Sequence, residues 1–287
     1  MVLKASTLYI VGTPIGNLGD LSPRAAQVLS AVDFIVAEDT RVTRKLLNHL
    51  RVKGTLLSYH AHSKPDREEE VVTLLKGGAC GAMCTDAGMP CISDPGDRLV
   101  RLCHEEGLSV EVVPGPSAVS AAIALSGIEA NRYCFEGFLP PKGVSRRQRL
   151  DELATEQRTV VLFEAPHRLT ATLQDLLSAL GDRTVAVCKE MTKLHEHTTR
   201  TSLSNALQFY KKGTDGRGAL KGEYVLVVEG CRAQKKPDID VDETRAALMS
   251  ALESGSSGKD AVLNVSERLC ISRNVVYRIL QQILRDQ

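Results

Sequence analysis

The chain has 287 residues, of which 43% are hydrophobic and 25% are charged, which is ordinary globular composition with room for two or three domains. The net charge is only +1, which excludes a uniformly basic nucleic-acid binder, so any basic surface has to be local. Trp is absent and aromatic residues make up 4%, which argues against a base-stacking aromatic platform.

The first half of the chain alternates short apolar runs with amphipathic stretches such as 65–76. The runs predict strands, and their alternation with helical patterns predicts parallel βαβ units. The Pro114-Gly115-Pro116 segment then opens an alanine-rich helix over 117–126. The predicted strands are 7–11, 32–37, 55–58, 79–84 and 108–113.

The second half has fewer clean alternations, which predicts a mixed sheet. Strands are predicted at 132–138, 159–163, 183–189 and 223–229, and helices at roughly 145–156, 166–180 and 202–212. With a boundary near 114–118, we predict an α/β fold of two α/β domains, 1–115 with a parallel sheet and 116–232 with a mixed one.

After a polar linker over 231–240, three short apolar periods predict a small helical domain of helix-turn-helix type over 238–287. The third period begins at Ser272, a good N-cap residue. The predicted apolar faces carry Val241, Leu248 and Leu252, then Val262, Val265 and Leu269, then Val276, Ile279, Leu280 and Ile283.

The cysteines and the ends of the chain bear on its compartment. The eight cysteines form no CxxC pair and no zinc-binding spacing with histidine. The amino terminus enters a strand without a signal peptide, and no apolar run reaches the length of a membrane span. We expect a reduced cytoplasmic protein without a metal.

The segment 85–96 predicts a ligand site. It links a buried strand to a helix and holds two Gly, two Pro and two Asp. Gly and Pro fix unusual backbone angles, and ligands of open α/β sheets bind at the carboxyl ends of the strands. An ordinary surface connection is the alternative.

A second glycine loop, 11–17, favours the ligand interpretation, because it follows the first predicted strand. It is not GxGxxG, although Glu38 and Asp39 end the next strand, so a dinucleotide site stays open. The same loop could approach another flat polar cofactor, or be a tight turn without a ligand.

Two polar segments follow other strands of the same edge. Glu38, Asp39 and Arg41 end the second strand, where Asp39 or Thr40 could instead only cap a helix. His60 and His62 follow the third strand. Without a third ligand nearby, we interpret them as surface or substrate-contacting histidines.

The segment 142–149 contains Lys142, Arg146, Arg147 and Arg149 and no acid, as a phosphate-binding patch would. A solvated helix face is the alternative. The charges of 189–196 are expected to pair among themselves. No sequence motif supports a hydrolase or ATPase function, because a nucleophile elbow, a P-loop and HExxH are all missing.

Together these segments resemble one family. The order of the motifs is similar to that in the ribosomal RNA small subunit methyltransferase I family of the tetrapyrrole (corrin/porphyrin) methylase superfamily, from residue 7 to the end. The matching motifs lie at 8–18, 37–41, 85–96, 114–118, 137–140, 163–168, 189–193 and 222–225.

The resemblance implies two α/β domains with S-adenosylmethionine (SAM) in a cleft between them. It implies methylation of the ribose 2′-hydroxyl of a cytidine in the decoding region of small-subunit (16S) rRNA, by a homodimer. The implied cofactor-binding residues are Gly12, Pro14, Asp86, Ala87, Gly88, Ile92, Ser93, Ser117, Ala118, Phe163, Pro166 and Leu220.

Methyl transfer needs an in-line approach of the ribose oxygen to the methyl group and help in removing the 2′-proton. Catalysis should therefore come mainly from positioning and from a general base. We expect Glu38, Asp39 and Arg41 to be catalytic, with an acid preferred over His60 as the base. Expected RNA contacts are His60, Lys142, Arg146 and Arg147, on free rRNA or the 30S subunit. A small-molecule tetrapyrrole methylase and an inactive ribosome-binding protein are the alternatives.

Overall fold

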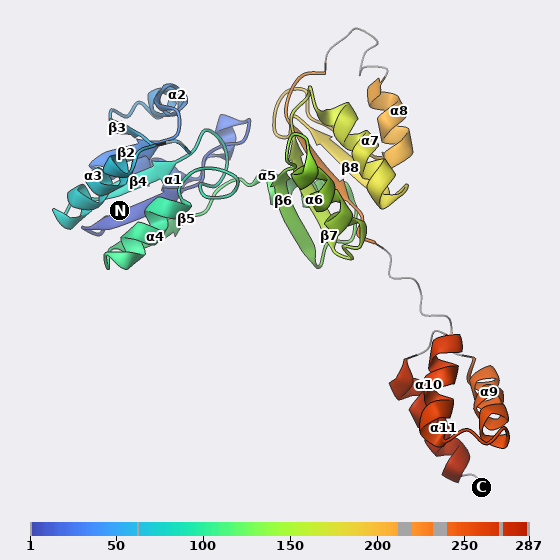
Figure 1. The fold of residues 1–287 in the computed structure, drawn as a ribbon. Helices are drawn as coiled ribbons and strands as arrows, with labels where there is room; N and C mark the ends of the chain where they lie inside the picture. The colour runs from blue at the N-terminus through green and yellow to red at the C-terminus, as the bar shows by residue number, and fades with distance from the viewer. Residues whose placement is uncertain (1, 62, 212–219, 232–239, 270–271, 286–287) are drawn as a thin grey trace. The chain divides into compact units, whose positions relative to one another are not determined.

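The computed structural model describes residues 2–61, 63–211, 220–231, 240–269 and 272–285, so the predicted linker and His62 lie largely or wholly outside the described residues. The chain divides into two compact units, Met1–Cys231 and Arg232–Gln287. The first unit holds two five-stranded sheets, and the second is helical (Figure 1).

The first sheet is parallel, as predicted, and its strand order is β3-β2-β4-β1-β5. β4 lies between β1 and β2, so the segment 85–96 leaves the middle of the sheet at its carboxyl edge. The strands are β1 (Thr7–Val11), β2 (Phe34–Ala37), β3 (Thr55–Ser58), β4 (Gly81–Cys84) and β5 (Ser109–Val113).

Helices cover both faces of this sheet because successive strand residues point to opposite sides. Tyr9, Ile35 and Ala82 pack toward α1 (Pro23–Ala31) and α2 (Thr40–Leu50). Leu8, Phe34, Val36 and Met83 face the other way, toward α3 (Pro65–Lys76) and α4 (Asp97–Glu105). A short 3-10 helix, η1 (Leu18–Asp20), follows the first loop.

The second sheet has the order β6-β7-β10-β8-β9, with only β6 and β7 parallel, which confirms the predicted mixed sheet. Helices α6, α7 and α8 pack on one face, and α5 packs on the other. The elements are α5 (Ala118–Ser126), β6 (Tyr133–Phe138), α6 (Val144–Ala154), β7 (Thr159–Glu164), α7 (Leu169–Leu180), β8 (Thr184–Lys189), β9 (His197–Ser202), α8 (Leu203–Lys211) and β10 (Tyr224–Val228).

The sequence interpretation missed β9, whose residues HTTRTS carry no apolar alternation. Threonine favours strands, and β9 pairs along its length with β8 at the edge of the sheet. None of the residues of β9 is buried, so the usual hydrophobic signal is absent.

The helical unit contains α9 (Val241–Glu253), α10 (Gly258–Arg268) and α11 (Arg273–Arg285), as the three apolar periods predicted. Leu248, Val265 and Val276 are at most 3% exposed in its core. Val241, the first residue of the predicted apolar face of α9, is 50% exposed at the start of the helix. Asp240 and Ser257 cap α9 and α10 with their side chains.

Candidate active site

The loops after β1, β4 and β5 join at the carboxyl edge of the first sheet. Thr13 and Gly88 exchange backbone hydrogen bonds of 2.8 and 3.1 Å, and the Gly12 N–H donates to the Val113 carbonyl at 3.0 Å. A Cβ on Gly12 would lie 2.7 Å from the backbone of Gly115. Gly12 is therefore required for the close approach of two loops.

Backbone strain concentrates near this junction. Gly88 has a φ of +81°, which favours glycine. Cys91 and Ser93 in the same loop, and Glu190 and Thr192 after β8, also adopt positive φ without being glycine. Such conformations persist where the surrounding structure enforces them, and they are common at functional sites.

A cavity of 340 Å³ lies beside the junction and is lined by both α/β parts of the first unit. The predicted cofactor residues in its lining are Ala87, Gly88, Ile92, Ser117, Ala118, Phe163 and Pro166. Phe163 also packs edge-to-face on Phe138, another lining residue, with ring centroids 5.7 Å apart. Ser117 precedes α5 without a side-chain cap, so the first N–H groups of α5 face this region uncapped by that side chain.

The other predicted cofactor residues lie beside this cavity or beyond it. Pro14 and Asp86 line a second cavity of 130 Å³, together with Val42 and Lys45 of α2. Ser93 lies against β6, since a Cβ on Gly137 would be 2.7 Å from its hydroxyl. Leu220 packs on the core of the second sheet.

The predicted acids do come together at this edge. The Asp39 N–H donates to the Asp86 carboxylate at 3.1 Å, and the Asp86 N–H donates to Glu38 at 3.3 Å. Burial raises the pKa of Glu38 and of Asp86, and the nearby carboxylates add to both shifts. The loops after β2 and β4 are thus joined through two carboxylates, those of Glu38 and Asp86.

Asp39 and Arg41 form a close pair within this cluster. The Arg41 guanidinium donates to both Asp39 oxygens, and its Nη2 lies 2.6 Å from Oδ2. These hydrogen bonds lower the pKa of Asp39 to about 2. Asp39 also accepts from the Arg41 N–H as the N-cap of α2, which confirms the capping interpretation.

Asp94 is a functional candidate that the sequence reasoning missed. It lines the 340 Å³ cavity, and burial together with the charge of Glu38 raises its pKa to about 6. It was visible as the second Asp of the 85–96 loop. Nothing in the spacing shows that the loop returns its side chain toward the residues after β2.

Two sets of charged residues lie on the second-sheet side of the cavity, around the lining residues Glu164 and Glu223. Glu164 is 3% exposed, accepts from the Ala165 N–H at 2.8 Å and forms an ion pair with Arg168. Lys193 lies 2.9 Å from both Glu190 and the lining residue Glu223. The predicted pairing of charges within 189–196 is confirmed by Lys193 and Glu190.

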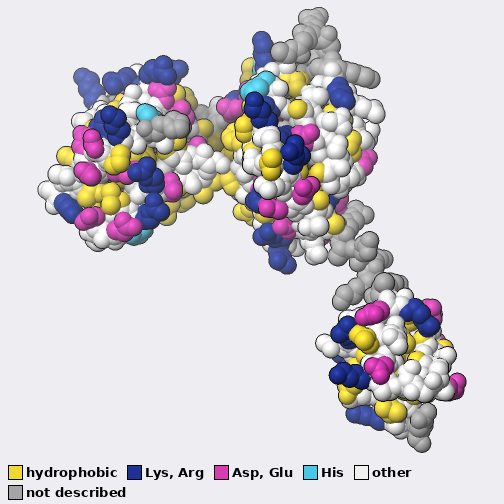
Figure 2. All heavy atoms as spheres, viewed as in Figure 1, with side chains coloured by type: hydrophobic (Ala, Val, Ile, Leu, Met, Phe, Trp, Pro, Cys, Tyr) yellow, Lys and Arg dark blue, Asp and Glu magenta, His cyan; other side chains and the backbone are white. Residues whose placement is uncertain are grey.

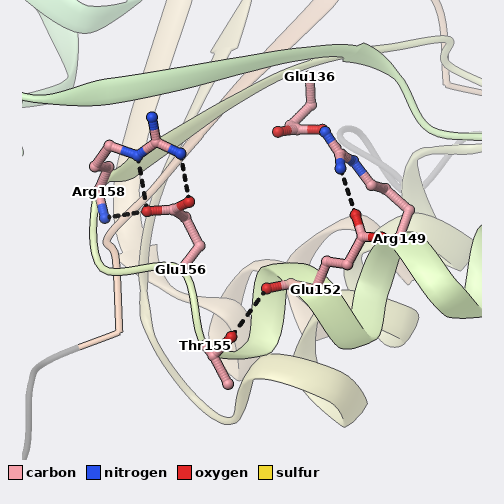
Figure 3. A network of polar contacts seen from close by, with 6 residues as sticks. All are labelled: Glu136, Arg149, Glu152, Thr155, Glu156 and Arg158. Carbon is pink, nitrogen blue, oxygen red and sulfur yellow. Dashed lines mark hydrogen bonds and ion pairs between the residues drawn. The ribbon is translucent and has the colours of Figure 1, made fainter.

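The basic segment 142–149 is largely neutralised by acids distant in sequence. Arg146 is 7% exposed and donates to Asp175, to Thr172 and to the Pro140 carbonyl. Arg149 lies 2.5 Å from Glu136 and also bonds Glu152 (Figure 3). Lys142, Arg147 and Arg149 are exposed, and of these three only Lys142 and Arg147 form no ion pair within the described residues. Burial of Arg146 argues against a direct phosphate contact there.

His60 is exposed at the same sheet edge, in a polar hollow of 450 Å³ with Lys64 and Arg67, and its N–H donates to the Ser63 hydroxyl at 2.8 Å. Within the described residues, no group of three His, Cys, Asp or Glu could hold a metal ion. In the same part of the chain, no helix is long and apolar enough to cross a membrane.

Comparisons with known proteins agree with this architecture. The family of tetrapyrrole (corrin/porphyrin) methylases matches residues 7–207. A ribosomal RNA small subunit methyltransferase I from Synechocystis is 41% identical over 97% of the chain and 99% of the relative. A protein of that name from Thermotoga maritima is 49% identical over 78% of the chain and 98% of its own length.

Solved structures share the fold at low identity. A cobalt precorrin-4 methyltransferase of cobalamin biosynthesis is 21% identical with a TM-score of 0.57, covering 77% of this chain and 94% of its own. A uroporphyrin-III C-methyltransferase from Thermus thermophilus is 18% identical with a TM-score of 0.54 and the same coverage of both chains.

Proposed function

Because the chain belongs to the tetrapyrrole (corrin/porphyrin) methylase family, and relatives matching nearly its whole length are named ribosomal RNA small subunit methyltransferase I, we propose that it is a SAM-dependent methyltransferase of small-subunit rRNA. The finer proposal is that it methylates the ribose 2′-hydroxyl of a cytidine in the decoding region. One observation carries the proposal: a cavity lined by a glycine loop lies beside a cluster of carboxylates.

The lining residues fit SAM. A volume of 340 Å³ lies within the usual range for small-molecule sites. Phe163, Ile92 and Met191 supply an apolar wall for an adenine ring, and the start of α5 offers N–H groups to a carboxylate. Asp94 and Glu164 suit the positive charges of the cofactor. When bound, SAM would supply a methyl group carried on a positively charged sulfur.

The remaining cofactor residues act on the shape of the site in this proposal. Gly12 permits the close packing of the loops after β1 and β5. Pro14, Asp86 and Ser93 fix the loops on either side of the cavity. Leu220 anchors the chain just before the lining residue Gly222.

The carboxylates would remove the 2′-proton. A base works best when its pKa approaches the working pH, which favours Glu38 and Asp94, whose pKa values are raised, over Asp39, whose pKa is about 2. Asp39 and Arg41 would then hold the start of α2 and orient Glu38 through the bonds to Asp86. Glu38 thus takes the proton, and Asp94 supports the positive charge in the cavity.

Small-subunit rRNA, free or in the 30S subunit, is the proposed partner, with His60, Lys142 and Arg147 as exposed contacts. Arg146 is left out because it is buried. A homodimer and a cytoplasmic location belong to the same proposal, and light scattering of the purified protein in solution tests the first of these.

The decisive assay uses 30S subunits from cells that lack the protein, incubated with SAM and the purified chain. Mass spectrometry of the digested 16S rRNA should find one additional ribose methyl on a cytidine. Methylation of a tetrapyrrole instead would favour the small-molecule alternative. SAM binding without methylation of either substrate would contradict the proposed substrate, and absence of SAM binding would favour an inactive ribosome-binding protein.

A further inference from the structure

A run of uncompensated positive charge begins at the acid cluster. Residues 40–64 contain no Asp or Glu, although the whole chain balances 36 Lys and Arg against 35 Asp and Glu. The run spans α2, β3 and the loop that carries His60. Its Lys and Arg residues are Arg41, Arg44, Lys45, Arg51, Lys53 and Lys64.

Helix α2 turns these charges outward. Thr43, Leu46 and Leu47 are buried, whereas Arg44, Lys45 and Arg51 are exposed. In Figure 2, Lys and Arg side chains gather along the border of the first domain where Figure 1 places α2. The helix therefore presents one apolar face to the sheet and one basic face to solvent.

Nothing in the described part of the chain neutralises this face. Arg41 pairs with Asp39, and no ion pair within the described residues involves Arg44, Lys45 or Arg51. Like charges three or four positions apart, such as Arg41 with Arg44 and Lys45, destabilise a helix. Positive side chains early in a helix also oppose its dipole. Helix stability therefore does not account for the pattern, which suits a partner outside the chain.

The position of α2 ties this face to the site. Asp39, which caps α2, bonds to Asp86, and Lys45 lines the 130 Å³ cavity that also contains Asp86. The carboxylates of Glu38, Asp86 and Asp94 would repel a nucleic acid approaching the reacting centre. A row of cations beside them would counter that repulsion and hold phosphates near the edge.

Resting on the proposed function, we propose that the outward face of α2 with Arg44 and Lys45, together with the C-cap residue Arg51, is the docking surface for the phosphate backbone of the substrate RNA. It holds the RNA next to the carboxylates, so that a ribose reaches the cavity. The contacts are to phosphates, which position the RNA without reading its sequence.

The test neutralises this face and compares it with matched charge loss elsewhere. The variant is Arg44→Gln/Lys45→Gln/Arg51→Gln in the full chain. The control is Arg101→Gln/Arg132→Gln/Arg200→Gln, which removes three exposed charges: one from α4 on the other face of the sheet, one just before β6 and one from β9. Binding to 30S subunits lacking the methyl group is measured from 50 to 200 mM salt, with SAM affinity by calorimetry alongside.

For the α2 variant we expect at least tenfold weaker binding at low salt, and a salt slope of log K reduced by about 2 to 3 for three lost phosphate contacts. SAM affinity should not change. The control should keep most of its affinity for 30S subunits and most of its salt slope. Unchanged affinity and slope in the α2 variant, or equal losses in the control, would overturn the inference.

Two further outcomes separate this inference from the proposed function. If the wild-type protein methylates 30S subunits and the α2 variant does so with the same KM, the docking surface is wrong and the function stands. If the wild-type protein binds SAM but neither binds nor methylates 30S subunits, the proposed substrate is wrong. Binding to vesicles that mix phosphatidylglycerol with phosphatidylcholine, if it is as tight as binding to 30S subunits and is lost in the α2 variant, would reassign the surface to a membrane.

Discussion

Two basic segments of the chain look alike in sequence and differ in structure. In the segment 142–149, Arg146 is buried against Asp175, and Arg149 is paired with Glu136 and Glu152. On α2, Arg44 and Lys45 are exposed and belong to a run without a single acid. A local count of charges therefore does not tell which cations are free, because the neutralising acids can come from distant strands and helices.

The difference assigns separate roles to the two regions. Charges that are paired around the second sheet hold its elements together, whereas charges left free at the edge of the first sheet are available to a ligand. Substitutions at the first-sheet edge should therefore change binding or turnover and leave the fold intact. Substitutions of Arg146 or Arg149, the paired members of the segment 142–149, should change stability and leave binding intact.

The largest effect at the first-sheet edge is expected from Gly88→Val. A β-branched side chain at a φ of +81° strains the loop, and the added atoms enter the cavity wall. We expect at least about 100-fold weaker SAM binding in calorimetry, from roughly 3 kcal/mol of lost interaction and added strain.

Gly107→Val is the matched control, because Gly107 has a φ of +69° with open space around it and lies outside the cavity. It carries similar backbone strain, so its SAM affinity should stay at the wild-type value. Equal losses in both variants would mean that strain alone, and not the cavity, explains the effect.

The largest effect around the second sheet is expected from Arg146→Ala. It leaves Asp175 and Thr172 without their partner, and because Asp175 is partly exposed we expect a loss of about 2 kcal/mol in the free energy of unfolding. Arg44→Ala should change it by less than about 0.5 kcal/mol. Urea unfolding of both variants measures this, and equal stability of the two would remove the distinction between the segments.

Glu38→Gln should lower turnover about tenfold or more while SAM affinity is kept, because the amide cannot accept the 2′-proton. Asp39→Asn should cost less, since the low pKa of Asp39 makes it a poor base. Single-turnover kinetics on 30S subunits measure both. Near wild-type turnover in both variants, together with an inactive His60→Ala, would transfer the role of base to the histidine.

Asp94 predicts a pH dependence. Its pKa is raised from 3.8 to about 6, so the carboxylate is charged only above that pH. Turnover should fall as the pH drops through about 6, and Asp94→Asn should remove that step from the profile. A profile that is identical in the variant would exclude Asp94 from the reaction.

The raised pKa of Asp94 affects the free energy of unfolding in the opposite direction to turnover. An acid whose pKa is higher in the folded state binds more protons when folded, so its contribution to stability decreases as the pH rises from 3.8 to about 6 and is constant above. The wild-type protein should therefore lose stability relative to Asp94→Asn across that interval, while its turnover rises.

The smallest effect on the cavity is expected from removing the helical unit. A chain ending at Cys231 keeps one whole compact unit, so SAM affinity should stay at the wild-type value. Methylation of 30S subunits should drop if the helical unit helps to engage RNA. Full-rate methylation by the shortened chain would exclude that role.

Much of the fold could be predicted from the sequence because its signals are local. The strand 7–11 and the helix 65–76 were placed at their observed bounds, since a buried apolar run and a Pro-initiated periodic segment need no distant information. The polar edge strand β9 was missed because its pairing with β8, and not its composition, makes it a strand.

The site was predictable where glycine and proline mark a loop, as at Gly88 and Ser117, and both residues line the cavity. Asp94 and the free charge of α2 were not predicted, for a shared physical reason. A raised pKa or a missing ion pair depends on groups that the fold brings together, such as Glu38 with Asp94. Burial of Arg146 is another consequence of tertiary structure that no local pattern reveals.

The measurement that tests the central claim most directly is mass spectrometry of 16S rRNA from cells with and without the protein. We predict that one methylated cytidine ribose in the decoding region is missing without the protein and returns when purified chain and SAM are added to the 30S subunits. Identical ribose methylation in both rRNA samples, with no methyl added by the purified protein, would contradict it.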